Sequence, residues 1–305
     1  MLQLTINTLA LGAAYALVAM GFVLILNATN AVNFAHGALV MLGSYIAFTI
    51  GSLLPVVGLL LLPLLLIAAA IVGLLLYFIA YLPLKDKPVT SVFISTISAG
   101  VIFENAVLLI YGPEPRITPP VIGTSAFKIG DTVISEQSLA VIAAAAVLIV
   151  GQQLLFTRTR LGKQLRAAAQ DPDIAAACGM NVGLMVALTF AIAAALAAAA
   201  GMFLSATYYA SPTDGANYTM KAYIAVTIGG WGSIPGAVIG ALLVALFEVV
   251  IPSLPALFPA LMQAVPHAAD LFTMTASTIA LFIAFLIVLL FRPQGLFGET
   301  IKRRA

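Results

Sequence analysis

Few side chains of this sequence could do chemistry, and several of them interrupt long apolar stretches. Glu104 and Asn105 lie in the middle of one such stretch, and His36 follows three asparagines near the start of the chain. An ionisable side chain inside a bilayer is costly, so it indicates a functional site by default. Polar side chains also join neighbouring membrane helices. Glu104 is therefore interpreted either as part of an ion or substrate path or as a hydrogen-bonded packing acid.

Hydrolytic chemistry has weak support in the sequence. An intramembrane protease would have to use Ser233 as nucleophile and His36 or His267 as base, but no Gly-x-Ser-x-Gly turn surrounds Ser233. The single cysteine, Cys178, excludes an internal disulfide and a multi-thiolate metal site, and the two histidines form no pair at helical spacing. We therefore expect no catalytic residue, no metal and no cofactor, and the protease is the lesser alternative.

The elements that carry these residues are predicted to be membrane helices. The chain is 63% apolar and only 8% charged, and its mean hydropathy of +1.15 is far above that of soluble domains. A hydrocarbon core takes about 20 apolar helical residues to cross. We predict an all-α polytopic transmembrane bundle, a single transmembrane domain over 1–305. Its spans are predicted at 4–26, 34–51, 53–82, 89–111, 139–156, 184–208, 220–250 and 272–291, the seventh being broken by Gly and Pro.

The basic residues predict which ends face the cytoplasm. Ten of the thirteen Lys and Arg residues fall within 85–87, 158–166 and 292–304, and the positive-inside rule assigns these segments to the cytoplasm. The N-terminus is then outside and the C-terminus inside. No Lys or Arg precedes the first apolar stretch, so we expect a retained helix and no cleaved signal peptide. The net charge of +2 does not indicate a nucleic-acid partner.

Two interrupted segments are candidate pathway elements. Glycines and a proline crowd at 229–236, and asparagines crowd at 27–33, each between apolar arms. Backbone freed at such breaks cannot face lipid, so it has to pack on protein or line a wet cavity, as in transporters built from repeats. We expect Lys221 to extend to the outer interface, although it could meet a substrate carboxylate, and Glu248 to reach the interface as well. The predicted pathway residues are Asn30, Asn33, His36, Ser95, Thr96, Glu104, Asn105, Trp231 and Ser233.

Two connections are predicted outside the membrane. The segment 112–138 begins with four prolines and continues with β-branched runs around Gly130-Asp131, which indicate a small extracytoplasmic hairpin. The segment 252–270 also carries four prolines and is expected to be irregular.

The polar segment 157–181 is predicted to lie in the cytoplasm. Asp171 suits an N-cap, Pro172 the first helical position and Gly179 a left-handed C-terminal residue, which together predict a two-turn helix. Its apolar edge could enter a groove of another protein. The alternative is an interfacial helix that lies on lipid headgroups, although Asp171 and Asp173 would be repelled by anionic lipid.

At this point the sequence resembles a known family, the LivH-type permease subunits of ABC importers for branched-chain amino acids. The resemblance runs from the first span to the last, and two of its motifs together are specific. The motifs are Asn33-Phe34-Ala35-His36-Gly37 with Met41-Leu42-Gly43-Ser44-Tyr45, Arg166-Ala167 with Asp171 and Ala175 to Gly179, Ala187-Leu188-Thr189-Phe190, and Gly229-Gly230-Trp231-Gly232-Ser233-Ile234-Pro235-Gly236-Ala237.

The resemblance implies a subunit that imports branched-chain amino acids, or a related solute such as urea or amides, across the bacterial inner membrane. It implies two ABC ATPase subunits, a second homologous permease and an extracytoplasmic solute-binding protein as partners within the lipid bilayer. The chain itself has no Gly-x-x-x-x-Gly-Lys-Ser/Thr run, so ATP hydrolysis is expected in a partner. The alternative is a stand-alone ion-coupled carrier or channel. The implied ATPase-coupling residues are Arg160, Gly162, Arg166, Asp171, Pro172, Ile174, Ala175 and Gly179.

Overall fold

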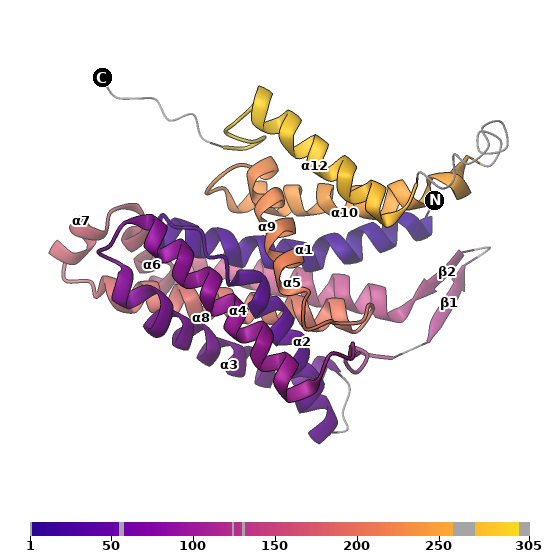
Figure 1. Cartoon of the computed structure of the whole chain (residues 1–305), viewed down its shortest axis with the longest axis horizontal. Coiled ribbons are helices and arrows are strands. Elements are labelled where there is room, and N and C mark those ends of the chain that lie inside the picture. The colour runs from indigo at the N-terminus through magenta and orange to yellow at the C-terminus, as the bar shows by residue number, and fades with distance from the viewer. Residues whose placement is uncertain (1, 55–57, 124, 130–131, 259–271, 299–305) are drawn as a thin grey trace.

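The computed structural model describes residues 2–54, 58–123, 125–129, 132–258 and 272–298. Within them the chain is an α-helical bundle with one small hairpin (Figure 1). The helices are α1 (Leu2–Thr29), α2 (His36–Leu53), α3 (Gly58–Leu76), α4 (Val89–Tyr111), α5 (Glu136–Arg158), α6 (Arg160–Gln170), α7 (Pro172–Ala177), α8 (Val182–Ser205), α9 (Gly215–Gly229), α10 (Ile234–Leu257) and α12 (Met274–Phe291).

The predicted fold class is confirmed. Eight helices in the described ranges are long and apolar enough to cross a membrane: α1, α2, α3 with its extension to Leu84, α4, α5, α8, α10 and α12. The chain is therefore a polytopic helical bundle.

The centre of the bundle is formed by α1 and α8, whose middle turns are buried all round. Close approach there depends on small side chains, as is usual for membrane helices. A Cβ on Gly43 would overlap the backbone of Ala198, and one on Gly201 would overlap the carbonyl oxygen of Val40. The Ser44 hydroxyl adds a hydrogen bond of 2.9 Å to the Gly201 carbonyl oxygen. Close backbone packing thus fixes the position of α2 against α8, and α2 begins with His36.

The broken span predicted at 220–250 is two helices, α9 and α10, joined by a tight reversal. Gly230 and Gly232 have φ angles of +122° and +79°, which only glycine adopts without strain. Beyond the reversal the two helices touch, because Gly240 has no side chain to hold its backbone away from the Ala225 carbonyl. Glycine and proline thus produce a reversal, as expected, but α9 has only 15 residues, whereas α10 has 24.

A segment after the last helix covers this reversal. The backbone N–H groups of Leu296 and Phe297 donate to the carbonyl oxygens of Ile228 and Gly229, each at 2.9 Å. Carbonyl groups at a helix C-terminus have no partner within the helix. We call residues 292–298 the C-terminal strap, because they supply the missing partners for α9.

The predicted hairpin is confirmed. Strand β1 (Ala126–Ile129) pairs antiparallel with β2 (Thr132–Ser135), and Ile129 lies opposite Thr132, which leaves a two-residue loop. The loop residues themselves, Gly130 and Asp131, lie outside the described residues. Figure 1 shows β1, β2 and the start of α1 at one end of the bundle and α7 at the opposite end. These are called the hairpin end and the α7 end below.

The expectation of irregular structure from residue 252 onward is wrong for its first part. Helix α10 continues through Pro252 and Pro255 to Leu257. A proline removes one backbone donor, and membrane helices tolerate it where another group bonds the freed carbonyl region. Pro252 and Pro255 cannot donate to the carbonyl groups of Glu248 and Ile251, and next to the first of these the Ser253 hydroxyl donates to the Val249 carbonyl oxygen at 2.7 Å. Residues 259–271 lie outside the described ranges.

Candidate functional site

Two helices begin next to one another inside the bundle, and polar side chains hold them there. At the start of α2, the Gly37 N–H donates to the Thr219 hydroxyl of α9 at 3.0 Å. In the preceding loop, the Phe34 N–H donates to the Thr96 hydroxyl of α4 at 3.2 Å, and the Thr219 hydroxyl lies 3.2 Å from the Phe34 carbonyl oxygen. The interrupted backbone therefore packs on protein, which is the arrangement that hydrocarbon requires.

His36 joins this junction to α1. Its ring is completely buried, and Nε2 lies 2.9 Å from the carbonyl oxygen of Val18. The ring also meets Phe22 edge-on at 5.9 Å between centroids, and Gly21 leaves space for it. These contacts are those of a structural support for the broken segment. Among the described residues, Nδ1 of His36 and Nδ2 of Asn33 are buried without a hydrogen-bond partner.

Glu104 lies against the start of α9. Its carboxylate lies beside the backbone N–H of Ala216 in the first turn of α9, and a Cβ on Gly215 would collide with it. A negative charge at a helix N-terminus is stabilised by the helix dipole and by the unpaired N–H groups of the first turn. This contact favours the packing interpretation of Glu104, in which the acid anchors α9.

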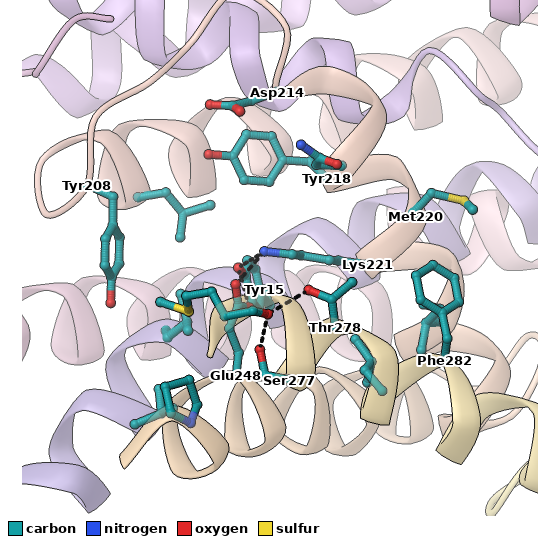
Figure 2. Close-up of a pocket in the computed structure, with 18 of the residues that line it drawn as sticks. Tyr15, Tyr208, Asp214, Tyr218, Met220, Lys221, Glu248, Ser277, Thr278 and Phe282 are labelled. Atoms are coloured by element: carbon teal, nitrogen blue, oxygen red, sulfur yellow. Dashed lines mark hydrogen bonds and ion pairs between the residues drawn. The ribbon is translucent and has the colours of Figure 1, made fainter. Parts of the chain in front are cut away.

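A cavity of about 740 Å³ lies beside the first turns of α1, in the half of the bundle that is nearer the hairpin end (Figure 1). Its wall is formed by α1, the end of α8, α9, α10 and α12 together with the segment between α8 and α9 (Figure 2). Most of its lining is apolar or aromatic, including Leu11, Leu204, Tyr218 and Phe282. The volume and the lining are those of a site for a small molecule.

An ion pair lies in this cavity, which we call the outer cavity. The Nζ of Lys221 lies 2.6 Å from Oε1 of Glu248, and it also donates to the Tyr15 hydroxyl at 2.8 Å. The Tyr15 hydroxyl donates in turn to Oε2 of Glu248 at 2.8 Å, so that α1, α9 and α10 share one polar cluster. Figure 2 shows Lys221 and Glu248 pointing toward one another. This is the one salt bridge in the described part of the chain.

The expectation that Lys221 and Glu248 reach the interface separately is therefore wrong. The two side chains are only 27% and 22% exposed. A partly buried charge is stabilised by an opposite charge and by further hydrogen bonds, and here each charge finds both within reach.

A second carboxylate, Asp214, belongs to the same cavity. Its Oδ2 accepts the backbone N–H of Ser211 at 2.8 Å. Among the described residues that line the cavity, Lys221 is the one cation, so these residues carry two carboxylates and one ammonium group. Figure 2 shows Asp214 beside Tyr218 and away from Glu248.

The predicted pathway residues do not form one group. Asn33, His36, Thr96 and Glu104 gather around the starts of α2 and α9, as described above. Asn30 and Ser233 line a second cavity, of about 510 Å³, toward the α7 end. Ser233 caps α10 by accepting the Gly236 N–H at 3.1 Å.

The remaining predicted pathway residues have local partners. The Ser95 hydroxyl donates to the Ala80 carbonyl oxygen at 2.9 Å, and Asn105 donates to the Val101 carbonyl oxygen of its own helix at 2.8 Å while remaining exposed. Trp231 is 39% exposed and packs edge-on against Tyr223 at 5.8 Å. Their part in a pathway stays a prediction.

The capping pattern predicted for the polar segment 157–181 is confirmed in α7. Oδ1 of Asp171 accepts the Ile174 N–H at 2.9 Å, Pro172 opens the helix, and Gly179 has a φ of +80°. Ala175 is buried, whereas Ile174 is 63% exposed.

The preceding helix, α6, was not predicted. It begins at Arg160 with Thr159 as its N-cap and packs through Gly162 and Leu165, and a Cβ on Gly162 would overlap the Leu155 carbonyl oxygen. Arg160 and Arg166 are exposed, and Arg166 also lines the second cavity. Alternation of basic and apolar residues at helical spacing was the signal that could have revealed α6.

The chain matches one family along almost its whole length. A family model described as branched-chain amino acid transport system / permease component matches residues 4–291. The chain belongs to this family. It is a multi-pass membrane protein and the permease component of a transporter, which is not an enzyme.

Individual relatives agree with this assignment. The high-affinity branched-chain amino acid permease protein BraD of Pseudomonas aeruginosa is 33% identical over 311 residues, which cover 98% of this permease and 96% of the relative. The corresponding protein LivH of Escherichia coli K12 is 33% identical over 262 residues, 81% and 84% of the two chains. The xylose transport permease protein XylH of Haemophilus influenzae is 37% identical over 107 residues, a third of this permease and 28% of the relative. The comparison with solved structures found no significant match.

Proposed function

We propose that this permease is the membrane-spanning subunit of an ATP-driven importer that brings branched-chain amino acids into the cytoplasm. The observation that carries the proposal is the similarity to the BraD permease over nearly the full length of both chains. The outer cavity supports it, because its volume and largely apolar lining suit a small solute with an aliphatic side chain. A related solute such as urea or an amide is the second possibility for the cargo.

The energy for import is assigned to partners. The sequence contains no phosphate-binding Gly-x-x-x-x-Gly-Lys-Ser/Thr run, so two ABC ATPase subunits are the proposed motor. A second homologous permease completes the path, and a solute-binding protein delivers the cargo from outside. The proposed location is the inner membrane, with the N-terminus outside and the C-terminus in the cytoplasm.

The proposed contact with the ATPases is the α6–α7 segment. It lies at the end of the bundle opposite the hairpin (Figure 1), and Ile174 offers an apolar side chain on a short capped helix. ATP binding that draws the ATPases together would favour one state of the permease pair, because the two states would then differ in free energy. Arg160, Arg166 and Asp171 would accompany Ile174 in that contact.

The test is uptake of radiolabelled L-leucine by cells that carry or lack this permease. Vesicles with the co-purified partners would distinguish ATP from an ion gradient as the energy source. Import should require ATP on the side of the membrane that carries the ATPases, and it should persist when an ionophore collapses the ion gradients. Transport by the purified single chain in liposomes without ATP would refute the proposal and support an ion-coupled carrier instead.

A further inference from the structure

We propose that the outer cavity is a cargo-binding site built within this one permease, and that it recognises a small zwitterion by opening the Lys221–Glu248 ion pair. The cargo carboxylate would take Lys221, and the cargo ammonium group would take Glu248 or Asp214. This inference rests on the proposed import function and adds to it the place, the residues and the charge pattern of the cargo.

The first argument is the balance of charges in the lining. In the described part of the lining, Lys221 is the single cation, and Glu248 and Asp214 are the two carboxylates. A cargo with only a carboxylate would displace Glu248 from Lys221 and leave two carboxylates without a cation. A zwitterion brings one charge of each sign, so only one carboxylate lacks a cation, the same number as in the empty cavity.

The second argument is that the pair is accessible. Lys221 and Glu248 keep about a quarter of their side-chain surface exposed, 27% and 22%, and both face the cavity. The Tyr15 hydroxyl contacts both charges at 2.8 Å and can donate as well as accept. The Tyr15 hydroxyl can therefore stay bonded to Lys221 or to Glu248 while the other of these two side chains binds the cargo. Opening the pair then leaves neither Lys221 nor Glu248 without a hydrogen bond.

The third argument is the apolar part of the wall. Leu11, Leu204, Leu281 and Phe282 line the same cavity as the ion pair. The aliphatic side chain of an amino acid would move from water onto this apolar surface, while the amino and carboxyl groups of the same molecule stay beside the charged residues. Urea or a simple amide would form no charge-assisted hydrogen bond here and would bury little apolar surface.

The experiment measures thermal stabilisation of the purified full-length permease by L-leucine and by three compounds that lack part of its charge pattern. L-leucinol lacks the carboxylate, 4-methylpentanoate lacks the ammonium group, and urea lacks both. We expect L-leucine to raise the melting temperature at concentrations at which the other three have no effect. Stabilisation of equal size by L-leucinol or 4-methylpentanoate would overturn the proposal.

Substitutions then locate the effect. Lys221→Met and Glu248→Gln should each weaken L-leucine binding about 10- to 100-fold, the range expected for losing one hydrogen bond to a charged group. Lys128→Met and Glu114→Gln remove the same charges at exposed positions outside the cavity, and they should bind L-leucine like the unsubstituted permease. Unchanged L-leucine binding by Lys221→Met would overturn the proposal.

A charge swap separates recognition from a merely structural role. Lys221→Glu combined with Glu248→Lys restores an ion pair between α9 and α10 but exchanges the two charges relative to the apolar wall. We expect the swap to recover the melting temperature of the ligand-free protein while L-leucine binding stays at least about tenfold weaker. Recovery of both properties would show that the pair serves only packing.

The two proposals fail in different ways. If L-leucine binding depends on Lys221 but uptake does not depend on ATP, the ATP-driven import is refuted and the proposed site still stands. Conversely, ATP-dependent L-leucine uptake that is unchanged in Lys221→Met would refute the site and leave the import function intact.

Discussion

The capped helix α7 allows a direct test of the proposed coupling between the ATPases and this permease. Replacing Asp171 by Ala removes the 2.9 Å hydrogen bond from the Ile174 N–H. Loss of such a cap costs about 1 kcal/mol, which is a factor of about five in the population of the helix. A helix of six residues is marginal by itself, so a large share of α7 should unfold. Gly179→Val should act at the other end, since valine at a φ of +80° is strained by about 1–2 kcal/mol.

The assay compares three properties of the assembled transporter: permease content of the membrane, L-leucine uptake and ATP hydrolysis. We expect Asp171→Ala and Gly179→Val to leave the content unchanged and to lower uptake several-fold. Asp171→Asn is the matched control, because asparagine is an equally good cap and should keep most of the uptake. The reasoning is refuted if Asp171→Ala transports at the normal rate, or if Asp171→Asn is as defective as Asp171→Ala.

Three further substitutions test the packing of the polar junction. Gly37→Val should destabilise the permease by about 3 kcal/mol or more, because its Cβ would overlap the backbone of the α9 start, whereas Gly151→Val, with open space around it, should not; thermal unfolding compares the two. Glu104→Gln should cost about 0.3–1 kcal/mol through the lost charge at the α9 N-terminus and should keep uptake measurable. Ser44→Ala should cost about 0.6 kcal/mol, the usual value for a hydrogen bond between membrane helices.

Each of these has an outcome that would count against it. Equal stability of Gly37→Val and Gly151→Val would mean that the starts of α2 and α9 are not in contact. Complete loss of uptake in Glu104→Gln at unchanged melting temperature would point to an ion-coupling acid. A loss above about 2 kcal/mol in Ser44→Ala would exceed what a single interhelical hydrogen bond supplies.

Local features of this fold could be predicted from the sequence because each depends on neighbouring residues only. Apolar length predicts the membrane helices, and the β-branched runs beside Gly130-Asp131 predict the hairpin. The caps of α7 follow from Asp171, Pro172 and Gly179, since each acts within three residues of its own position.

The candidate site could not be predicted in the same way because it depends on helix rotation. Lys221 and Glu248 are separated by 27 positions, and they meet only because α9 and α10 fold back at Gly230–Ser233 with those two faces turned inward. Tyr15 comes from a helix more than 200 positions away. Apolar helices show no polar face that would fix their rotation, so their sequence does not predict which side chains meet. Charges of opposite sign on the two arms of a predicted reversal were the one available signal.

The C-terminal strap also bears on the order in which the chain can be completed during synthesis. Ribosomes extend a protein from its N-terminus, so Leu296 and Phe297 emerge only after α10 and α12 have been made. Until then the carbonyl groups of Ile228 and Gly229 lack the donors that bond them in the finished protein. The reversal between α9 and α10 therefore becomes fully bonded only after α12 has been made, and a chain shortened to residue 291 would never complete it.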